Sequence, residues 1–269
     1  MSYRRKHIKP KIRSLKKKEF IKKSLISIFL FLFIAVMILY FILFFSKFQV
    51  QKVDILGDEK NKSQDIKNLV WLDINKKIFS LGVFDISTKS IFMVDSKKIV
   101  KDILDKFPSI EDVKVQKKMP DKIVLNVKER KPFAIFCQSD NCFFIDESGV
   151  IFEPLHNNII KDMTIIQKDL DGKELFVGKN VIEKNIIDTI YKVQKDLKDN
   201  FQIDIKEVFV SNYLIFKTSE NWQIYFNSNS DVDLQITKMN ILLRDEIPVS
   251  VRKNIQYIYL QYKDRAYYK

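Results

Sequence analysis

The side chains best suited to chemistry in this chain are two cysteines and two histidines. Cys137 and Cys142 have a C-x₄-C spacing across a polar stretch that reads as a turn between two strands. Facing residues of an antiparallel pair lie ~4.5–5.5 Å apart at Cα, which is within reach of a disulfide. A metal site would need further soft ligands, and none lies near in the sequence. A local disulfide and two unpaired thiols remain as the two interpretations.

No catalytic constellation accompanies the cysteines. His7 lies in a basic N-terminal segment, and His156 lies in a predicted loop without an obvious partner. The chain has no G-x-S-x-G, no H-E-x-x-H and no Gly-rich phosphate loop. From residue 24 onward, 33 acidic residues alternate with 36 basic ones, as on an ordinary solvated surface. We therefore predict no catalytic residue, no cofactor site and no metal site.

The elements that must position these residues begin with a long apolar segment. Leu25 to Phe45 holds 21 residues without a charge, Pro or Gly. At ~1.5 Å per residue a helix of this length reaches ~32 Å, enough to cross a hydrocarbon core of ~30 Å. We therefore predict a transmembrane helix at 24–46, because a helix also satisfies its own backbone polar groups in lipid. A cleaved signal peptide is the alternative, but no A-x-A-like site follows the segment.

The distribution of charge predicts the orientation of this helix. Residues 1–23 contain eleven Lys and Arg and a single acid, Glu19, so only +3 of the net charge of +13 falls on residues 24–269. The positive-inside rule then predicts a single-pass type II protein in the cytoplasmic membrane, with a cytoplasmic tail at 1–23 and an extracytoplasmic region at 47–269. The tail can attract anionic lipid. Because the positive charge is confined to the tail, we predict no nucleic-acid binding.

Residues 47–130 have the pattern of a small α+β layer. The expected order is β-α-α-β-β, with two helices on one sheet face. The strands are expected around Val53 and Ile55, at 110–115 and at 123–127, and the helices at 62–72 and 95–107. Residues 75–90 do not fit this order, and we interpret them as an inserted loop or short hairpin.

Residues 131–269 have the pattern of a mainly antiparallel β domain with flanking helices, which makes the fold class of the whole chain α+β. Strands are expected at 133–137, 142–145, 150–152, 205–210, 213–218 and 222–226, and helices at 181–197 and 231–245. The last predicted strand is 255–262, which is rich in aromatic and branched residues.

Five motifs in order resemble those of the bacterial FtsQ/DivIB cell-division family. The most specific is V-K-E-R-K-P-F-A at 127–134, similar to the family's V-x-E-R-x-P-x-A. The others are V-D-I-L-G at 53–57, F-P-S-I-E-D-V-K-V at 107–115, M-P-D-K-I at 119–123 and F-I-D-E-S-G-V-I-F at 144–152. Two departures stand out: Met119 replaces the usual Trp, and Tyr257–Gln261 lacks the Asp and Arg of the family's Y-I-D-L-R.

The resemblance implies a POTRA domain at 47–130 and an FtsQ-type β domain at 131–269. It also implies a non-catalytic, membrane-anchored divisome scaffold at the division septum that links early and late division proteins. The implied partners are FtsB/DivIC-like and FtsL-like coiled-coil proteins, and FtsW/FtsI-like septal synthases beyond them. A membrane-tethered extracytoplasmic cell-envelope enzyme is the alternative, and a POTRA-type transport chaperone is a third reading.

The segment 255–262 is the candidate partner-binding site. A buried central strand would explain its hydrophobicity, whereas an edge strand could accept a partner strand by β-augmentation. The resemblance favours the edge, because it implies partner binding near the end of the β domain. Alternation would direct Ile258 and Leu260 towards a helix and Tyr257 and Tyr259 outward. The candidate residues are Ile255, Tyr257, Ile258, Tyr259, Leu260, Gln261 and Tyr262.

Overall fold

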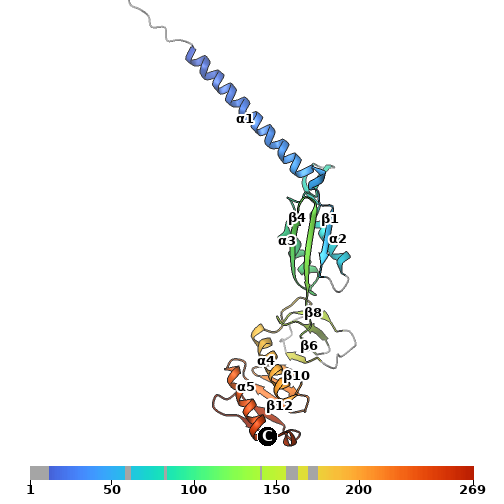
Figure 1. Ribbon diagram of the computed structural model, residues 1–269, viewed down its shortest axis with the longest axis vertical. Coiled ribbons are helices and arrows are strands. Elements are labelled where there is room, and N and C mark those ends of the chain that lie inside the picture. The colour runs from blue at the N-terminus through green and yellow to red at the C-terminus, as the bar shows by residue number, and fades with distance from the viewer. Residues whose placement is uncertain (1–11, 58–61, 82–83, 140, 156–162, 169–174) are drawn as a thin grey trace, which may run out of the picture. The chain divides into compact units, whose positions relative to one another are not determined.

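The computed structural model describes residues 12–57, 62–81, 84–139, 141–155, 163–168 and 175–269 (Figure 1). His7 and His156 lie outside the described residues. The chain divides into two compact units, one of residues 1–102 with 114–126 and one of residues 103–113 with 127–269. The predicted class is confirmed: an apolar helix, a POTRA domain and a mostly β domain follow one another.

The first unit begins with helix α1, Ile12–Phe44. Its stretch Phe20–Phe44 is long and apolar enough to cross a membrane, and its side chains are not buried against the rest of the chain. The helix covers residues 24–44 of the predicted span 24–46, so it starts earlier than predicted and ends two residues sooner. A short 3₁₀ turn, η1 (Ser46–Phe48), leads from it into the next element.

The POTRA domain contains a three-stranded sheet in the order β1-β5-β4, with two helices. Strand β1 runs parallel to β5, so that Val53 pairs with Ile123 and Ile55 with Leu125. The helices alternate apolar and charged residues at helical spacing, and the side chains on one apolar face of each helix, among them Ile66 and Ile99, are buried. The elements are β1 (Lys52–Leu56), α2 (Ser63–Ile74), α3 (Ser96–Lys106), β4 (Ile110–Lys118) and β5 (Lys122–Glu129).

The predicted insertion at 75–90 forms a two-stranded antiparallel hairpin of β2 (Lys76–Leu81) and β3 (Phe84–Thr88). The register pairs Phe79 with Ile86 and Leu81 with Phe84, and these apolar pairs alternate with the polar pair of Ser80 and Asp85. The hairpin is separate from the three-stranded sheet.

The second unit contains a nine-stranded sheet in the order β14-β13-β12-β11-β10-β9-β6-β7-β8. Most of its pairs are antiparallel, as predicted, but β9 is parallel to both β6 and β10, and β12 is parallel to β13. The strands are β6 (Ala134–Gln138), β7 (Asn141–Ile145), β8 (Ile151–Pro154), β9 (Ile165–Lys168), β10 (Ile205–Val210), β11 (Leu214–Thr218), β12 (Gln223–Phe226), β13 (Tyr257–Tyr259) and β14 (Tyr267–Tyr268).

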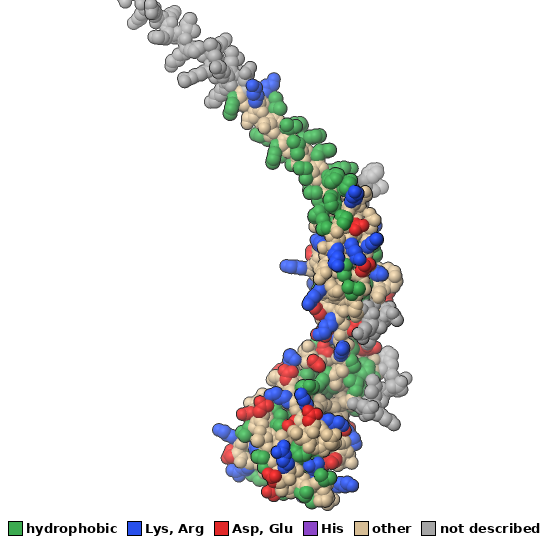
Figure 2. Space-filling model, viewed as in Figure 1, with side chains coloured by type: hydrophobic (Ala, Val, Ile, Leu, Met, Phe, Trp, Pro, Cys, Tyr) green, Lys and Arg blue, Asp and Glu red, His purple; other side chains and the backbone are tan. Residues whose placement is uncertain are grey.

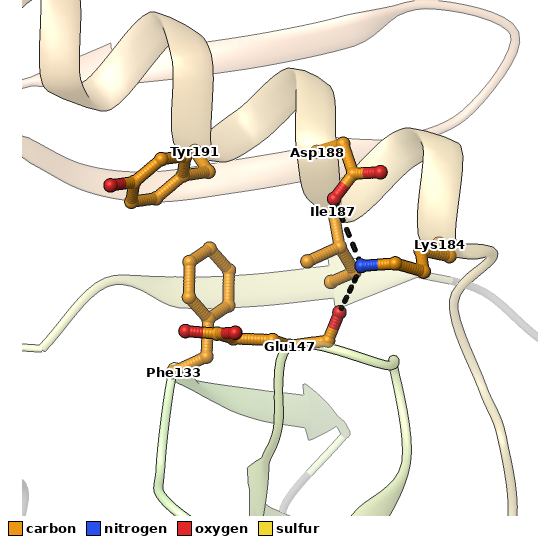
Figure 3. A pocket seen from close by; sticks show the side chains of 6 residues that line it. All are labelled: Phe133, Glu147, Lys184, Ile187, Asp188 and Tyr191. Atoms are coloured by element: carbon orange, nitrogen blue, oxygen red, sulfur yellow. Dashed lines mark hydrogen bonds and ion pairs between the residues drawn. The ribbon is translucent and has the colours of Figure 1, made fainter.

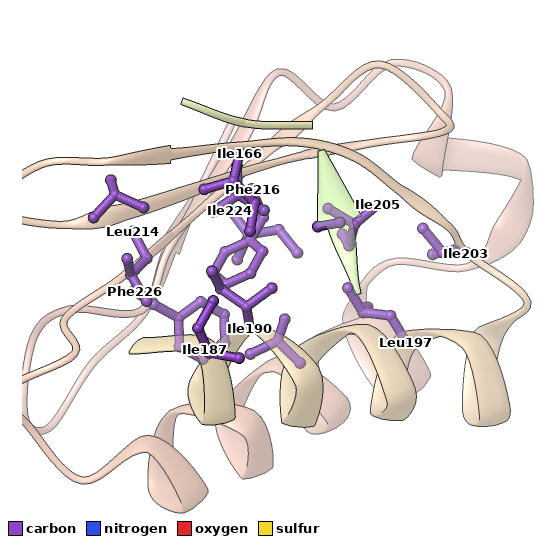
Figure 4. Close-up of a cluster of buried hydrophobic side chains, with 14 of the residues drawn as sticks. Ile166, Ile187, Ile190, Leu197, Ile203, Ile205, Leu214, Phe216, Ile224 and Phe226 are labelled. Carbon is purple, nitrogen blue, oxygen red and sulfur yellow. The ribbon is translucent and has the colours of Figure 1, made fainter. Parts of the chain in front are cut away.

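The core of this unit lies between one sheet face and its helices (Figure 4). Alternate residues of the strands, such as Phe216 and Phe226, meet the apolar stripe of α4, which includes Ile187, Ile190 and Leu197. The helices are α4 (Lys184–Phe201), α5 (Val232–Ile241) with the π turn η2 (Leu242–Glu246), and α6 (Val249–Arg252).

Candidate partner-binding site

The predicted partner-binding strand is shorter than expected and does not form the sheet edge. Strand β13 comprises only Tyr257–Tyr259, and the chain leaves the sheet after Leu260. On one side it pairs in parallel with β12, so that Ile258 faces Ile224. On the other side it pairs with β14, so that Ile258 faces Tyr268 and Tyr259 faces Tyr267. The prediction of an edge at 255–262 is therefore wrong, because β14 already occupies the outer side.

The two faces of β13 have the predicted polarity. Ile258 and Leu260 are fully buried, in the same apolar core as the α4 side chains. Tyr257 and Tyr259 lie half-buried on the opposite face, where the Tyr259 ring is 4.4 Å from that of Tyr225 and 4.6 Å from that of Tyr257. Burial, and then the neighbouring Tyr259, raise the pKa of the Tyr225 hydroxyl. This face of the sheet therefore presents a small tyrosine cluster.

The other candidate residues lie beside β13. Ile255 is buried just before the strand, whereas Gln261 is half-buried and Tyr262 exposed just after it. Strict alternation from Ile258 and Leu260 would bury Tyr262 on the same face, but β13 ends at Tyr259 and the chain turns before it reaches Tyr262. The Tyr262 ring instead meets that of Tyr267, with centroids 5.5 Å apart.

Lys238 of α5 anchors the turn that joins β13 to β14. Its Nζ donates to the backbone oxygens of Leu260 at 3.0 Å, of Tyr262, and of Arg265 at 3.5 Å. Burial lowers the pKa of this ammonium group, while the nearby Asp264 acts in the opposite direction. One side chain of a helix therefore holds three carbonyls of the turn, and so fixes where β14 lies.

Strand β14 is the end of the sheet among the described residues. Lys269 extends the pairing: its N–H donates to Tyr257 O at 3.2 Å and its oxygen accepts from Gln256 N at 2.6 Å. Tyr267 and Tyr268 are 46% and 45% exposed. Because N–H groups of an antiparallel strand alternate in direction, the inward N–H of Lys269 leaves that of Tyr268 pointing away from β13. An outward donor between two exposed aromatic side chains is what an added strand would pair with.

The two cysteines are joined by a disulfide. Cys137 of β6 and Cys142 of β7 are register partners with Cα atoms 4.2 Å apart, on either side of the turn that the sequence indicates. The bond ties the two strands together close to their turn and lies far along the sheet from β14 in strand order.

A small pocket lies where the amino-terminal half of α4 faces the residues around Phe133 and Glu147 (Figure 3). Two of its charged side chains form an ion pair, with Lys184 Nζ 3.1 Å from Asp188 Oδ1, and Lys184 Nζ also lies 3.5 Å from the backbone oxygen of Glu147. The aromatic rings of Phe133 and Tyr191 form its other side. No group of three metal-ligating side chains occurs among the described residues. We find no arrangement for catalysis in this pocket.

Two parts of the site, Lys238 and β14, were not predicted from the sequence. A signal for β14 exists, because the polar run Lys263-Asp264-Arg265 precedes Tyr267-Tyr268 and can mark a turn between two strands. Lys238 has no such signal, because an ammonium that binds carbonyls of a distant turn looks in sequence like any exposed helix lysine.

Comparisons with known proteins agree with this architecture. Residues 85–130 match the family described as "POTRA domain, FtsQ-type". The chain is similar to the cell division protein DivIB of Clostridium tetani, with 27% identity over 58% of this chain and 60% of that protein. It is 25% identical to DivIB of Clostridium botulinum over 86% of each chain. It is also 27% identical to the cell division protein FtsQ of Bartonella bacilliformis, over 45% of this chain and 35% of that protein.

Proposed function

The chain belongs to the FtsQ/DivIB family of cell division proteins, and on this premise we propose that it is a non-catalytic, membrane-anchored scaffold of the division machinery. It binds FtsB/DivIC-like and FtsL-like proteins, and through them it links early division proteins to FtsW/FtsI-like septal synthases. The observation that carries this proposal is the open strand β14 at the end of the nine-stranded sheet. A partner strand added there would gain main-chain hydrogen bonds, and the exposed tyrosines would supply specificity.

The proposed site differs from the strand that the sequence indicated. The partner would pair with Tyr267 and Tyr268 directly, while Tyr257, Tyr259 and the buried Ile258 and Leu260 form the layer behind them. Tyr262, whose ring packs on Tyr267, would lie beside the incoming strand. Ile255 and Gln261 would act only by supporting the ends of β13.

The proposed topology places 1–23 in the cytoplasm, the span at 24–46, a POTRA domain at 47–130 and a partner-binding β domain at 131–269 outside. The single long apolar helix among the described residues and the basic tail that precedes it support this arrangement. A reporter that is active only outside the cytoplasm, fused after Lys269, should be active while the anchor stays uncleaved. An inactive reporter would contradict the orientation, and a soluble shortened product would contradict the anchor.

The test of the binding site is a capture experiment with the full chain in detergent, using FtsB/DivIC-like and FtsL-like proteins of the same cell as prey. Tyr268→Pro removes the outward N–H and places a ring beside the incoming strand, but leaves the inward hydrogen bonds of Lys269 in place. We expect capture to weaken about tenfold or more, the equivalent of losing ~1.4 kcal/mol of binding free energy. Tyr268→Ala should retain most of the binding, because its backbone donor survives.

A thermal melt of each variant provides the control. Tyr267→Pro should detach β14 from β13, because the N–H of Tyr267, two residues before that of Lys269, points in the same inward direction and would be lost. It should lower both stability and capture. Full capture by a folded Tyr268→Pro variant would show that β14 is not the binding edge. Failure of the unaltered chain to capture either prey would contradict the scaffold function itself.

A further inference from the structure

The carboxyl end of α1 is capped by side chains from elsewhere in the first unit. The last carbonyls of a helix lack partners within the helix. Here Ser90 Oγ donates to Ile42 O at 2.9 Å, and Thr88 Oγ1 donates to Leu43 O at 2.5 Å. Gln49 Nε2 also donates to Leu43 O, at 2.7 Å. The segment 88–90 therefore lies directly against the last turn of the apolar helix.

These hydrogen bonds fix the depth of the segment relative to a membrane. The apolar stretch of α1 runs to Phe44, so the carbonyls of Ile42 and Leu43 lie at the end of the part of the helix that lipid would surround. Groups that hydrogen-bond these carbonyls lie within a few ångströms of the same depth. Thr88 and Ser90 are themselves buried, so the hydroxyl groups that hydrogen-bond the end of α1 are fixed within the fold.

The residues that follow this contact expose large apolar side chains. Phe92 is 48% exposed and Met93 is 40% exposed, although both follow the fully buried Ile91. The Phe92 ring lies 5.3 Å from that of Phe48, which in turn meets Phe45 at 5.8 Å. Figure 2 shows hydrophobic side chains along α1 as far as its junction with the rest of the unit. The contacts between these rings thus connect the end of the apolar helix with Phe92 of the domain.

Basic residues adjoin this apolar surface. Lys47 directly precedes Phe48, and Lys89 lies between Thr88 and Ser90, and both are exposed. Lys89 reaches over the Trp71 ring, with Nζ 5.6 Å from the centroid. A cluster of aromatic and long apolar side chains with flanking lysines matches the chemistry of the lipid headgroup layer, where aromatic side chains are enriched and lysines reach phosphate.

We propose that Phe48, Phe92 and Met93 form a lipid-contacting collar that seats the POTRA domain on the membrane surface. The occupant is the headgroup layer around α1, with Lys47 and Lys89 directed at its phosphates. Such seating fixes the direction in which the POTRA domain leaves the membrane, because the hydrogen bonds of Thr88 and Ser90 prevent the domain from swivelling about the helix end. This inference rests on the membrane span of the proposed function, whichever way the helix is oriented.

The test uses the full chain in native membranes, with a benzophenone amino acid introduced at single positions. Positions Phe92 and Met93 probe the collar. Leu56 is the matched control, because it is 54% exposed in the same unit but lies at the end of β1, ~13 Å along the strand from Lys52. Phe33, in the middle of the apolar stretch, reports the span itself. After illumination, mass spectrometry of the purified chain measures phospholipid adducts.

We expect phospholipid adducts at Phe92 and Met93 to be several-fold more abundant than at Leu56, and to be comparable with those at Phe33. Adducts at Phe33 without adducts at Phe92 and Met93 would overturn the collar and leave the span intact. Absence of adducts at all four positions would instead contradict the span. Cross-links from Phe92 and Met93 to a protein in place of lipid would also overturn the proposal, because the surface would then be a protein contact.

A pair of serine substitutions tests the consequence. Phe92→Ser with Met93→Ser removes apolar surface that is already exposed, so the fold should persist, and the thermal melt should match that of Leu56→Ser. In vesicles, the collar variant should show faster proteolysis around residues 44–50 than Leu56→Ser does. Equal rates for the two variants would show that the collar does not seat the domain.

Discussion

The two edge strands of the nine-stranded sheet, β8 and β14, differ in how their outer sides are paired. At the β8 end, the chain returns at 178–181 and forms backbone hydrogen bonds with the start of β8 and with the turn before it. Ile151 N–H donates to Lys179 O at 3.0 Å, Gly178 N–H donates to Ile151 O at 2.7 Å, and Val181 N–H donates to Gly149 O at 2.9 Å. At the β14 end, no further strand follows among the described residues, and two tyrosines stand exposed.

The difference indicates which edge has a structural role and which is available to a partner. Unpaired strand edges invite association with other chains, and proteins usually cover or shorten them. Here one edge is covered, while the other is kept very short and is anchored by Lys238 of α5. Changes at the covered edge should therefore lower stability, whereas changes at the open edge should alter binding. The predictions below test this division, beginning with the largest effect.

Gly149→Ala should destabilise the covered edge most. Gly149 has φ of +80°, which disfavours any side chain, and an added Cβ would overlap the backbone oxygen of Ile182. We expect a loss of about 4 kcal/mol in the free energy of unfolding, because strain and a backbone clash act together. Chemical denaturation of the second unit measures it. A change below ~1 kcal/mol would mean that the return segment moves away easily and that this edge is no more closed than β14.

Asp146→Ala should have the next largest effect. This buried carboxylate forms an ion pair with Arg130, and it accepts hydrogen bonds from Ser148 N and Val150 N, both at 2.9 Å. Its loss leaves a mostly buried guanidinium and two turn N–H groups without their acceptor. Breaking such a pair on one side costs about 3 kcal/mol.

A matched variant distinguishes the effect of the lost negative charge from the effect of the lost hydrogen bonds in the turn. Asp146→Asn keeps an acceptor oxygen for the two N–H groups but removes the negative charge, so it should cost less than Asp146→Ala. Capture of partners by either variant, while folded, should equal that of the unaltered chain. Equal losses of stability in both variants would assign the whole effect to the ion pair with Arg130.

Reduction of Cys137–Cys142 should cost about 2 kcal/mol, because the loop it closes is short and therefore constrains the unfolded chain little. Alkylation before and after reduction reports whether the bond is present in exported protein, where no thiol should react until reductant is added. Partner capture should be unaffected, since β6 and β7 lie at the other part of the sheet from β14. Two reactive thiols in natively exported protein would show that the disulfide does not form.

Local patterns predicted most of the elements, and what they missed lies in contacts between distant segments. Helices α2, α3 and α4 were found because apolar residues recur at helical spacing, and the facing positions of Cys137 and Cys142 followed from their turn. Strand β9 was not predicted, because it has only four residues and its partners on both sides are parallel strands from distant parts of the chain. Alternation gave the burial of Ile258 and Leu260 correctly but carried no information about β14.

The edge prediction shows this limit most clearly. A strand with one buried face has the same sequence whether its outer side is free or paired, because the main chain makes the pairs. Only the position of Lys269 against Tyr257, and of Lys238 against the turn, shows that β13 is the second strand. The candidate site is therefore β14 instead of β13. The interaction expected of it, backbone pairing beside tyrosines, is the same for both strands.

Lys238→Met should have the smallest effect on overall stability, and it tests what holds the open edge in place. The Lys238 ammonium binds three carbonyls of the turn, and without it β14 should separate more often from β13. We expect a loss of roughly 1 kcal/mol, measured as faster hydrogen exchange at Tyr257 and Lys269. Lys192→Met, which removes an exposed helix lysine paired only with Asp233, is the control and should leave that exchange unchanged.

The pH dependence of the same variant sharpens the assignment. Because burial lowers the pKa of Lys238, the folded chain binds this proton less tightly than the unfolded chain does. The Lys238 contribution is therefore least favourable below the folded pKa, and it rises as the pH increases from that value towards the ordinary 10.5. Lysines with raised pKa, such as Lys98 and Lys128, oppose this trend in the whole protein. Those lysines are present in both proteins, so their contributions cancel when the unfolding free energy of Lys238→Met is subtracted from that of the unaltered chain. This difference should grow slightly as the pH rises from the folded pKa of Lys238 towards 10.5. A difference that stays constant over that interval would mean that the ammonium is solvated in the folded chain, and that β14 is held by its strand pairing alone.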